Sequence, residues 1–184
     1  ATLALLTWLA LRQLRLPAPG AGAMHLRLWA ALGLALLVVQ IALGGWVSAN
    51  YAALACSDFP LCNGNWVPEM DFARGFHFLR ALGMAAEGGP LANQALNAIH
   101  WAHRLGALIV FCYLALFAIA VVRTQGLQKY GALLLIILCV QVVLGIGNVM
   151  LSLPLALAVA HNAAAALLLI AMVVLNFKIN RIRE

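Results

Sequence analysis

Four long apolar stretches dominate this sequence. They cover residues 28–47, 98–122, 130–151 and 155–177. An α-helix needs about 20 mostly apolar residues to cross the hydrocarbon core of a bilayer. Because a backbone inside lipid has to satisfy its own hydrogen bonds, such stretches cross a membrane as helices. We therefore predict an all-α integral membrane protein whose body is a bundle of four transmembrane helices.

The composition agrees with this prediction and excludes one function class. Hydrophobic residues make up 66% of the chain and charged residues 9%, whereas soluble domains average about 45–50% and about 25%. The net charge is +6, which could indicate nucleic-acid binding. The basic residues, however, lie at the ends of the apolar stretches, which is the pattern of membrane topology. We expect membrane lipid around the chain and no nucleic-acid partner.

The chain outside the four stretches divides into three parts. Within residues 1–16 a mostly apolar stretch of eleven residues precedes Arg12 and Arg15, too short at about 1.5 Å per residue to cross a core of about 30 Å. We interpret them as one partial N-terminal helix, the end of a transmembrane helix that begins upstream. Residues 17–27 are predicted to be a cytoplasmic linker, and residues 178–184 a basic cytoplasmic tail. Residues 28–177 then form the membrane domain.

The long connection over residues 48–97 carries most of the acidic side chains. Four of the five acids lie there, Asp58, Glu69, Asp71 and Glu87, with two arginines and no lysine. Eight of the eleven basic residues lie at the opposite ends of the apolar stretches. By the positive-inside rule this loop lies outside the cytoplasm. Asp71 is a candidate N-cap for a short helix that carries Phe72, Phe76 and Leu79.

Two histidines lie inside apolar stretches, each near the outer end of its predicted helix. They are His103 and His161. Ionisable side chains within a membrane helix are costly and mark candidate functional sites. The two helices run in the same direction, so their imidazoles lie at similar depth and could ligate one iron from opposite sides. We predict a bis-histidine heme site. The alternative for His103 is a buried histidine bonded to a neighbouring carbonyl.

A short internal repeat supports the pairing. Residues 39–44 read VQIALG and residues 140–145 read VQVVLG, and each repeat precedes a helix with a histidine near its outer end. This arrangement predicts two pseudo-symmetric helical hairpins. Gly44 and Gly145 end the repeats, level with the histidines, where the absence of a side chain would let a flat ring approach the backbone. The alternative is that they only permit close helix packing.

Two polar residues flank His103. Arg104 could extend outward to the interface or bind a heme propionate through paired hydrogen bonds, and we favour the propionate. His100 lies one turn before His103 on the same face. It is a candidate supporting group and a weaker candidate ligand.

The outer loop contains a cysteine pair, Cys56 and Cys62. The space outside the cytoplasm is oxidising, so a disulfide is expected. It could be purely structural, or, as a short exposed bridge, it could be redox-active.

The ordered set of motifs resembles the heme A synthase family, in particular its C-terminal half. The matching elements are GGWV at 44–47, Cys56, FPLCNG at 59–64, WVP at 66–68, His103-Arg104 and His161. The resemblance implies that the chain is part of an enzyme that oxidises the C8 methyl group of heme O to a formyl group. The product, heme A, serves cytochrome oxidase assembly. It also implies two fused four-helix bundles, of which the C-terminal one holds heme b.

The resemblance places the oxidation chemistry upstream of this chain. In the N-terminal half of the family a glutamate stands three residues before the first histidine, and here that position is His100. None of the four apolar stretches contains a carboxylate, so no catalytic residue is assigned. The implied partners are heme O and heme A through the upstream half, with heme O synthase or oxidase assembly factors as further candidates.

Two other functions stay open at this point. One is a free-standing membrane b-type cytochrome that carries electrons. The other is a membrane thiol oxidoreductase that works through Cys56 and Cys62 with a quinone.

Overall fold

The computed structural model describes residues 2–14, 21–79, 81–86 and 88–180. Arg15, residues 17–20 of the predicted linker, Glu87 and residues 181–184 of the predicted tail lie outside the described residues. Among those that are described, every named element is a helix, which confirms the all-α prediction.

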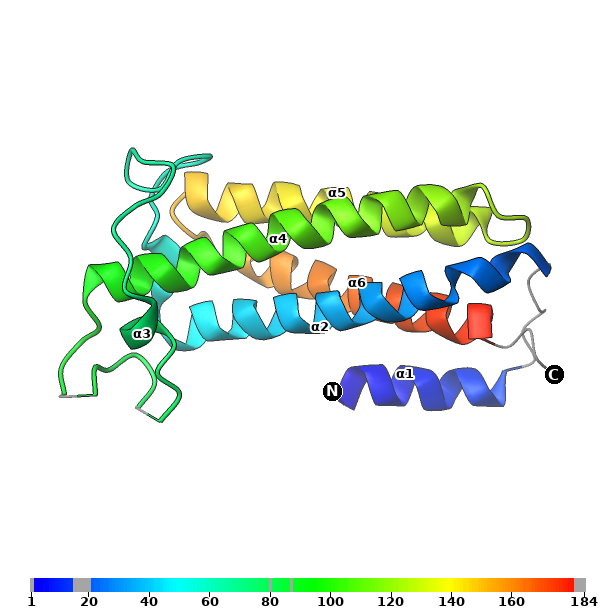
Figure 1. The fold of residues 1–184 in the computed structure, drawn as a ribbon, viewed down its shortest axis with the longest axis horizontal. Helices are drawn as coiled ribbons and strands as arrows, with labels where there is room; N and C mark the ends of the chain where they lie inside the picture. The colour runs from blue at the N-terminus through cyan, green and yellow to red at the C-terminus, as the bar shows by residue number, and fades with distance from the viewer. Residues whose placement is uncertain (1, 15–20, 80, 87, 181–184) are drawn as a thin grey trace.

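Four long helices form the body of the molecule. They are α2 (Arg27–Ala49), α4 (Asn93–Val122), α5 (Gln128–Met150) and α6 (Leu155–Asn180). Each is long and apolar enough to cross a membrane, as predicted. The chain is therefore a membrane protein whose long axis follows these helices (Figure 1).

The four helices form a closed ring. Helix α2 packs against α4 and α6, and α5 packs against the same two helices. Successive helices run in opposite directions, so α4 and α6 run in the same direction and lie diagonally across the bundle. This diagonal matters because α4 carries His103 and α6 carries His161.

The shorter helix α1 (Thr2–Gln13) lies beside one half of the bundle, where it packs against α6. A 3-10 helix, Ala21–Leu26, leads directly into α2. Figure 1 shows α1 at the end of the bundle that lies away from α3. Whether α1 continues an upstream transmembrane helix stays a prediction.

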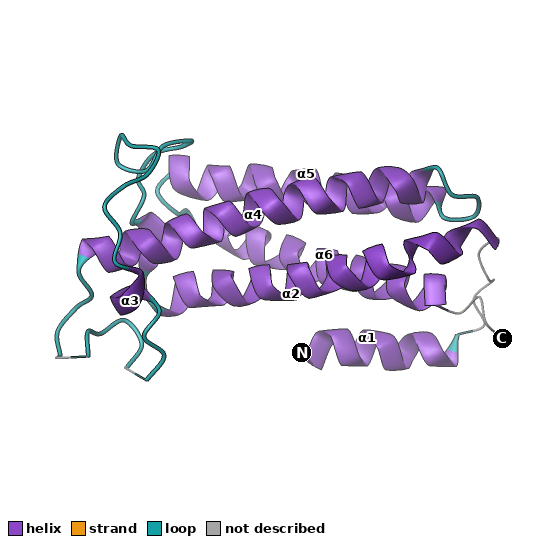
Figure 2. Cartoon of the chain, viewed as in Figure 1, coloured by secondary structure: helices purple, strands orange, loops and turns teal. Residues whose placement is uncertain are grey.

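The long outer loop gathers at one end of the bundle (Figure 2). It contains a 3-10 turn, Ala52–Leu54, and the one-turn helix α3 (Phe72–Gly75). The Asp71 side chain caps α3 by accepting a hydrogen bond from the backbone N–H of Arg74 at 2.9 Å, as predicted. The helix ends at Gly75, however, and does not reach Leu79.

Helix α4 begins earlier than its apolar stretch. The predicted span starts at residue 98, but the helix starts at Asn93. The added turn is polar, and the Asn97 amide donates to the backbone carbonyl of Glu69 at 3.3 Å. The helix therefore extends beyond the apolar stretch and supports the loop, which hydropathy alone does not reveal.

The larger apolar core fills the half of the bundle that lies toward α1, and a smaller one around Val47, Ala95 and Ile99 lies at the outer end. Leu114 and Phe117 of α4, Leu134 of α5 and Met172 of α6 are all fully buried in the larger core. Toward the outer end, no residue is buried within 38–46 of α2, 101–109 of α4, 139–147 of α5 or 155–163 of α6. The bundle is thus tightly packed below the level of the histidines and loosely packed around them.

Candidate functional site

His103 lies between α4 and α2, and its partner is Gln40. The Gln40 side-chain nitrogen is 3.0 Å from Nδ1 of the imidazole and donates to the His103 backbone carbonyl at 3.0 Å. A single amide thus holds both the ring and the backbone of one residue.

His161 has the equivalent neighbour on the other side of the bundle. The Gln141 side-chain nitrogen is 3.1 Å from Nε2 of His161. Gln40 and Gln141 occupy the same position in the two VQxxLG repeats, so the repeat appears in space as two glutamine–histidine pairs.

The two repeat glycines contact these same histidines. A Cβ atom built on Gly44 would lie 3.2 Å from Cε1 of His103, and one built on Gly145 would lie 3.1 Å from Cε1 of His161. Both distances are shorter than most Cβ contacts in proteins. Each glycine therefore gives its imidazole room that any other residue would occupy.

Several polar atoms at this level lack a partner. The side-chain oxygens of Gln40 and Gln141, and Nδ1 of His161, are buried and accept or donate no hydrogen bond. An unsatisfied buried polar group costs about 1–3 kcal/mol, so several together in one place call for an explanation, such as a bound ligand.

These features fit a heme held between α4 and α6. The described residues contain no group of three or more His, Cys, Asp or Glu side chains that could hold a bare metal ion. A heme iron takes four ligands from its porphyrin and needs only axial ligands from the protein. Two diagonal histidines, two glycines beside them and loosely packed helices meet that need.

Arg104 is turned toward the outer loop. Its Nη1 donates to the carbonyl of Leu61 at 2.7 Å and its Nη2 to the carbonyl of Cys56 at 3.1 Å. The guanidinium group also lies over the Phe59 ring, 5.9 Å from its centroid. Arg104 therefore joins the loop to α4. Its predicted contact with a heme propionate stays a prediction.

His100 belongs to the same junction. Its Nδ1 is 3.3 Å from the backbone nitrogen of Cys56, and its Nε2 is 3.2 Å from Nε of Arg104. A neutral imidazole accepts at only one nitrogen, so one of these contacts is a hydrogen bond at a time. His100 is buried against the loop, one turn from His103.

The sulfur atoms of Cys56 and Cys62 lie at disulfide distance, 2.03 Å apart, and both residues are buried. The loop between them is closed by Asp58, whose carboxylate accepts from the backbone N–H groups of Asn63 at 2.5 Å and Gly64 at 2.9 Å. The hydrogen bond from Gly64, followed by the one from Asn63, holds the pKa of Asp58 below its ordinary value of 3.8. The loop is thus compact, and Arg104 binds two of its carbonyl groups.

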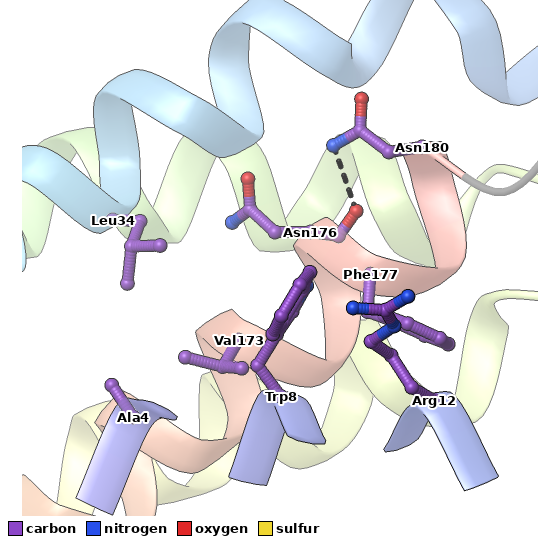
Figure 3. A pocket seen from close by; sticks show the side chains of 8 residues that line it. All are labelled: Ala4, Trp8, Arg12, Leu34, Val173, Asn176, Phe177 and Asn180. Atoms are coloured by element: carbon purple, nitrogen blue, oxygen red, sulfur yellow. Dashed lines mark hydrogen bonds between the residues drawn. The ribbon is translucent and has the colours of Figure 1, made fainter. Parts of the chain in front are cut away.

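A cavity of about 640 Å³ lies at the other end of the molecule, between α1, α2 and α6. Figure 3 shows Trp8 and Arg12 of α1 facing Asn176 and Phe177 of α6 across it. It lies beyond the apolar core from His103 and His161, so it is not the predicted heme site.

Comparison with known proteins identifies the family. The family model described as cytochrome oxidase assembly protein matches residues 1–173. A heme A synthase of Shewanella oneidensis is 41% identical over 176 residues, which cover 96% of this chain and 53% of that protein. The chain belongs to the heme A synthase family. A heme A synthase of a Caulobacter species is 33% identical over 83% of the chain and 42% of that protein.

The chain spans about half the length of these curated heme A synthases. No solved structure matched it. Membership of the heme A synthase family confirms the resemblance seen in the sequence, whereas the activity of the whole protein is a matter for proposal.

The contacts of Gln40 with His103 and of Gln141 with His161 were not predicted from the sequence. Both glutamines were visible as the second residue of each VQxxLG repeat, one turn before Gly44 and Gly145 and so on the same helix face. The signal was present, but the contact to a histidine depends on how neighbouring helices are rotated. The carbonyl partners of Arg104 gave no signal, because they belong to an irregular loop.

Proposed function

We propose that this chain is the heme b-binding C-terminal half of a heme A synthase, with His103 and His161 as the axial ligands of the iron. The observation that carries the proposal is the arrangement at the outer end of the bundle. Two histidines on diagonal helices each contact a glycine, at the one level where all four helices lack buried residues. Gly44 and Gly145 would lie beside the ring plane.

The whole enzyme would convert heme O to heme A by oxidising the C8 methyl group, for cytochrome oxidase assembly. The described helices of this chain contain no carboxylate, so the oxidation would take place in the other half. Heme b, when bound, supplies a one-electron redox centre. The role of this chain is then to bind the cofactor between α4 and α6 and shield it from water.

We further propose that the outer loop lies on the periplasmic side of a bacterial inner membrane. The described acids Asp58, Glu69 and Asp71 lie in that loop, whereas Arg12, Arg27, Arg123, Lys129 and Lys178 lie at the opposite end. This distribution follows the positive-inside rule. An oxidising compartment would also maintain a disulfide between Cys56 and Cys62.

The alternative thiol oxidoreductase function is less well supported. Exchange with another thiol requires access to a sulfur atom, and Cys56 and Cys62 are 0% and 1% exposed. The alternative of a free-standing b-type cytochrome shares the heme site, and differs only in lacking oxidation of heme O.

The experiment is to follow heme A formation by the complete protein that contains this chain. Heme O and heme A are extracted from membranes and separated by reverse-phase chromatography, for the wild type, His103→Ala and His161→Ala. We expect heme A from the wild type and a large fall in the heme A to heme O ratio in both variants. No heme A from the wild type would contradict the synthase assignment. An unchanged ratio in both variants would contradict a role for this heme site.

A further inference from the structure

The two glutamine–histidine pairs are equivalent in sequence but differ in which ring nitrogen the glutamine contacts. Gln40 contacts Nδ1 of His103 at 3.0 Å, whereas Gln141 contacts Nε2 of His161 at 3.1 Å. The nitrogen that a histidine offers to a metal is set by the hydrogen bond that its other nitrogen makes. The two contacts therefore have different consequences for heme binding.

At His103 the contact leaves Nε2 without a glutamine neighbour. A ligating histidine usually keeps a hydrogen bond at its second nitrogen, which fixes the orientation of the ring. The side-chain oxygen of Gln40 is buried and without a partner. Because the amide nitrogen can only donate, Nδ1 is the acceptor in this contact and Nε2 carries the ring proton. Iron binding at Nε2 would therefore require the proton to move to Nδ1 and the amide to turn, so that its oxygen accepts from Nδ1–H in place of the bond to the His103 carbonyl.

The absence of a side chain at Gly106 leaves room for the Gln40 amide. Gly106, one turn after His103, is in close contact with the side-chain oxygen of Gln40, and a Cβ atom there would overlap it. In α6 the residue at the same distance from His161 is Ala164, which is buried. The two pairs are thus held differently by their surroundings.

At His161 the contact involves the nitrogen that would bind iron if both histidines ligate through Nε2. The N–H of Gln141 donates to the Nε2 lone pair, while Nδ1 is buried without a partner. Iron and the Gln141 amide would compete for the same lone pair. Binding at His161 therefore requires the amide to leave.

Building on the heme site proposed above, we propose that Gln40 is a positioning residue that orients the His103 ring through Nδ1, whereas Gln141 occupies Nε2 of His161 and is displaced when heme binds. Iron binding then turns the Gln40 amide in place, but separates the Gln141 amide from Nε2 of its histidine. Before heme arrives, Gln141 satisfies a polar nitrogen within the bundle that would otherwise lack a partner.

The test is a titration of ferric heme into the complete chain, purified in detergent without heme. It compares the wild type with Gln40→Leu and Gln141→Leu, in which the amide is lost. Asn148→Leu is the matched control, because Asn148 is also buried and its side-chain oxygen has no hydrogen-bond partner among the described residues, the histidines included. Absorption spectra separate five-coordinate high-spin from six-coordinate low-spin heme, and circular dichroism verifies folding.

The two glutamine variants should change heme binding in opposite directions. One net hydrogen bond corresponds to about a threefold to tenfold change in affinity. Gln40→Leu should bind heme that much more weakly and with a larger high-spin fraction. Gln141→Leu should bind at least as tightly as the wild type and become low-spin at lower heme concentration. The control should resemble the wild type.

A fall in affinity for Gln141→Leu to the same extent as for Gln40→Leu would overturn the proposal, and so would two unchanged variants. In either case the heme site itself would stand, because the wild type binds heme. Absence of heme binding by the folded wild type would instead overturn the proposed function. If Gln40→Leu does not fold, the Gln141→Leu titration still decides the displacement.

Discussion

Gly44 of α2 lies against the imidazole of His103 on α4, so closely that an added Cβ atom would stand 3.2 Å from Cε1 of the ring. Gly145 of α5 has the same relationship to His161 of α6. The site therefore depends on the absence of side chains at Gly44 and Gly145 as well as on the two histidines. This relationship leads to the first prediction.

Gly44→Ala should lower the heme content of the purified chain, because the new methyl group displaces the His103 ring. Gly45→Ala is the control, since no atom lies within 4 Å of a Cβ built there. Alanine is favoured over glycine within a helix by about 0.5–1 kcal/mol, so a loss at Gly44 alone would come from the ring contact. Heme-to-protein ratio is the measurement, and equal ratios for the two variants would contradict this account of Gly44.

Arg104→Leu should loosen the outer loop. The guanidinium group makes hydrogen bonds to the carbonyls of Leu61 and Cys56, and a hydrogen bond to a charged group contributes about 1.5–3 kcal/mol. Without it, dithiothreitol should reduce the Cys56–Cys62 bond faster, as followed by thiol labelling. Arg74→Leu removes an exposed arginine that pairs with Asp71 at 3.7 Å, and should leave the reduction rate unchanged.

The stability of the outer loop should also depend on the protonation state of Asp58 at acid pH. The hydrogen bonds from Gly64 and Asn63 lower the pKa of Asp58 in the folded state. The stability that the carboxylate gives to the outer loop is therefore fully present above its ordinary pKa of 3.8. That contribution is lost as the pH falls from 3.8 through the lower folded-state pKa. The rate of disulfide reduction by an acid-active phosphine should rise over that interval in the wild type. Asp58→Asn should remove this rise, and a rise centred near neutral pH would contradict the role of Asp58.

Replacing both cysteines, Cys56→Ser with Cys62→Ser, should leave the heme spectrum unchanged. The bridge closes a short loop, with a sequence separation of 6, for which chain entropy predicts a stabilisation of about 2 kcal/mol. The variant should therefore melt at a lower temperature and still bind heme. Loss of heme A formation by the complete protein, with an intact heme spectrum and a folded loop, would favour a redox role for the pair.

The sequence predicted the parts of the structure that depend on hydropathy and on short-range geometry. The four apolar stretches became α2, α4, α5 and α6, because length and apolarity are sufficient to define a membrane helix. The Asp71 cap was also predictable, since it involves neighbours three residues apart. The VQxxLG repeat placed Gly44 and Gly145 level with the histidines, and in the structure Gly44 contacts His103 and Gly145 contacts His161. Their role at a heme stays a prediction.

Features that depend on tertiary packing were not predictable. Hydropathy placed the start of α4 at residue 98, but the polar turn from Asn93 onward is helical because it carries the outer loop. The contacts of Arg104 depend on where the carbonyls of Leu61 and Cys56 lie in that loop. The difference between Nδ1 of His103 and Nε2 of His161 likewise requires side-chain positions that no repeat encodes.

The central claim is that His103 and His161 together ligate one heme. The most direct measurement is a reduced-minus-oxidised optical spectrum with pyridine hemochrome analysis, for the wild type, His103→Ala and His161→Ala. His77→Ala, which changes an exposed histidine of the outer loop, is the control. The account predicts a low-spin b-type signal in the wild type and the control that is lost or becomes high-spin in both ligand variants. A folded wild-type chain without heme, or an unchanged low-spin signal in either ligand variant, would contradict it.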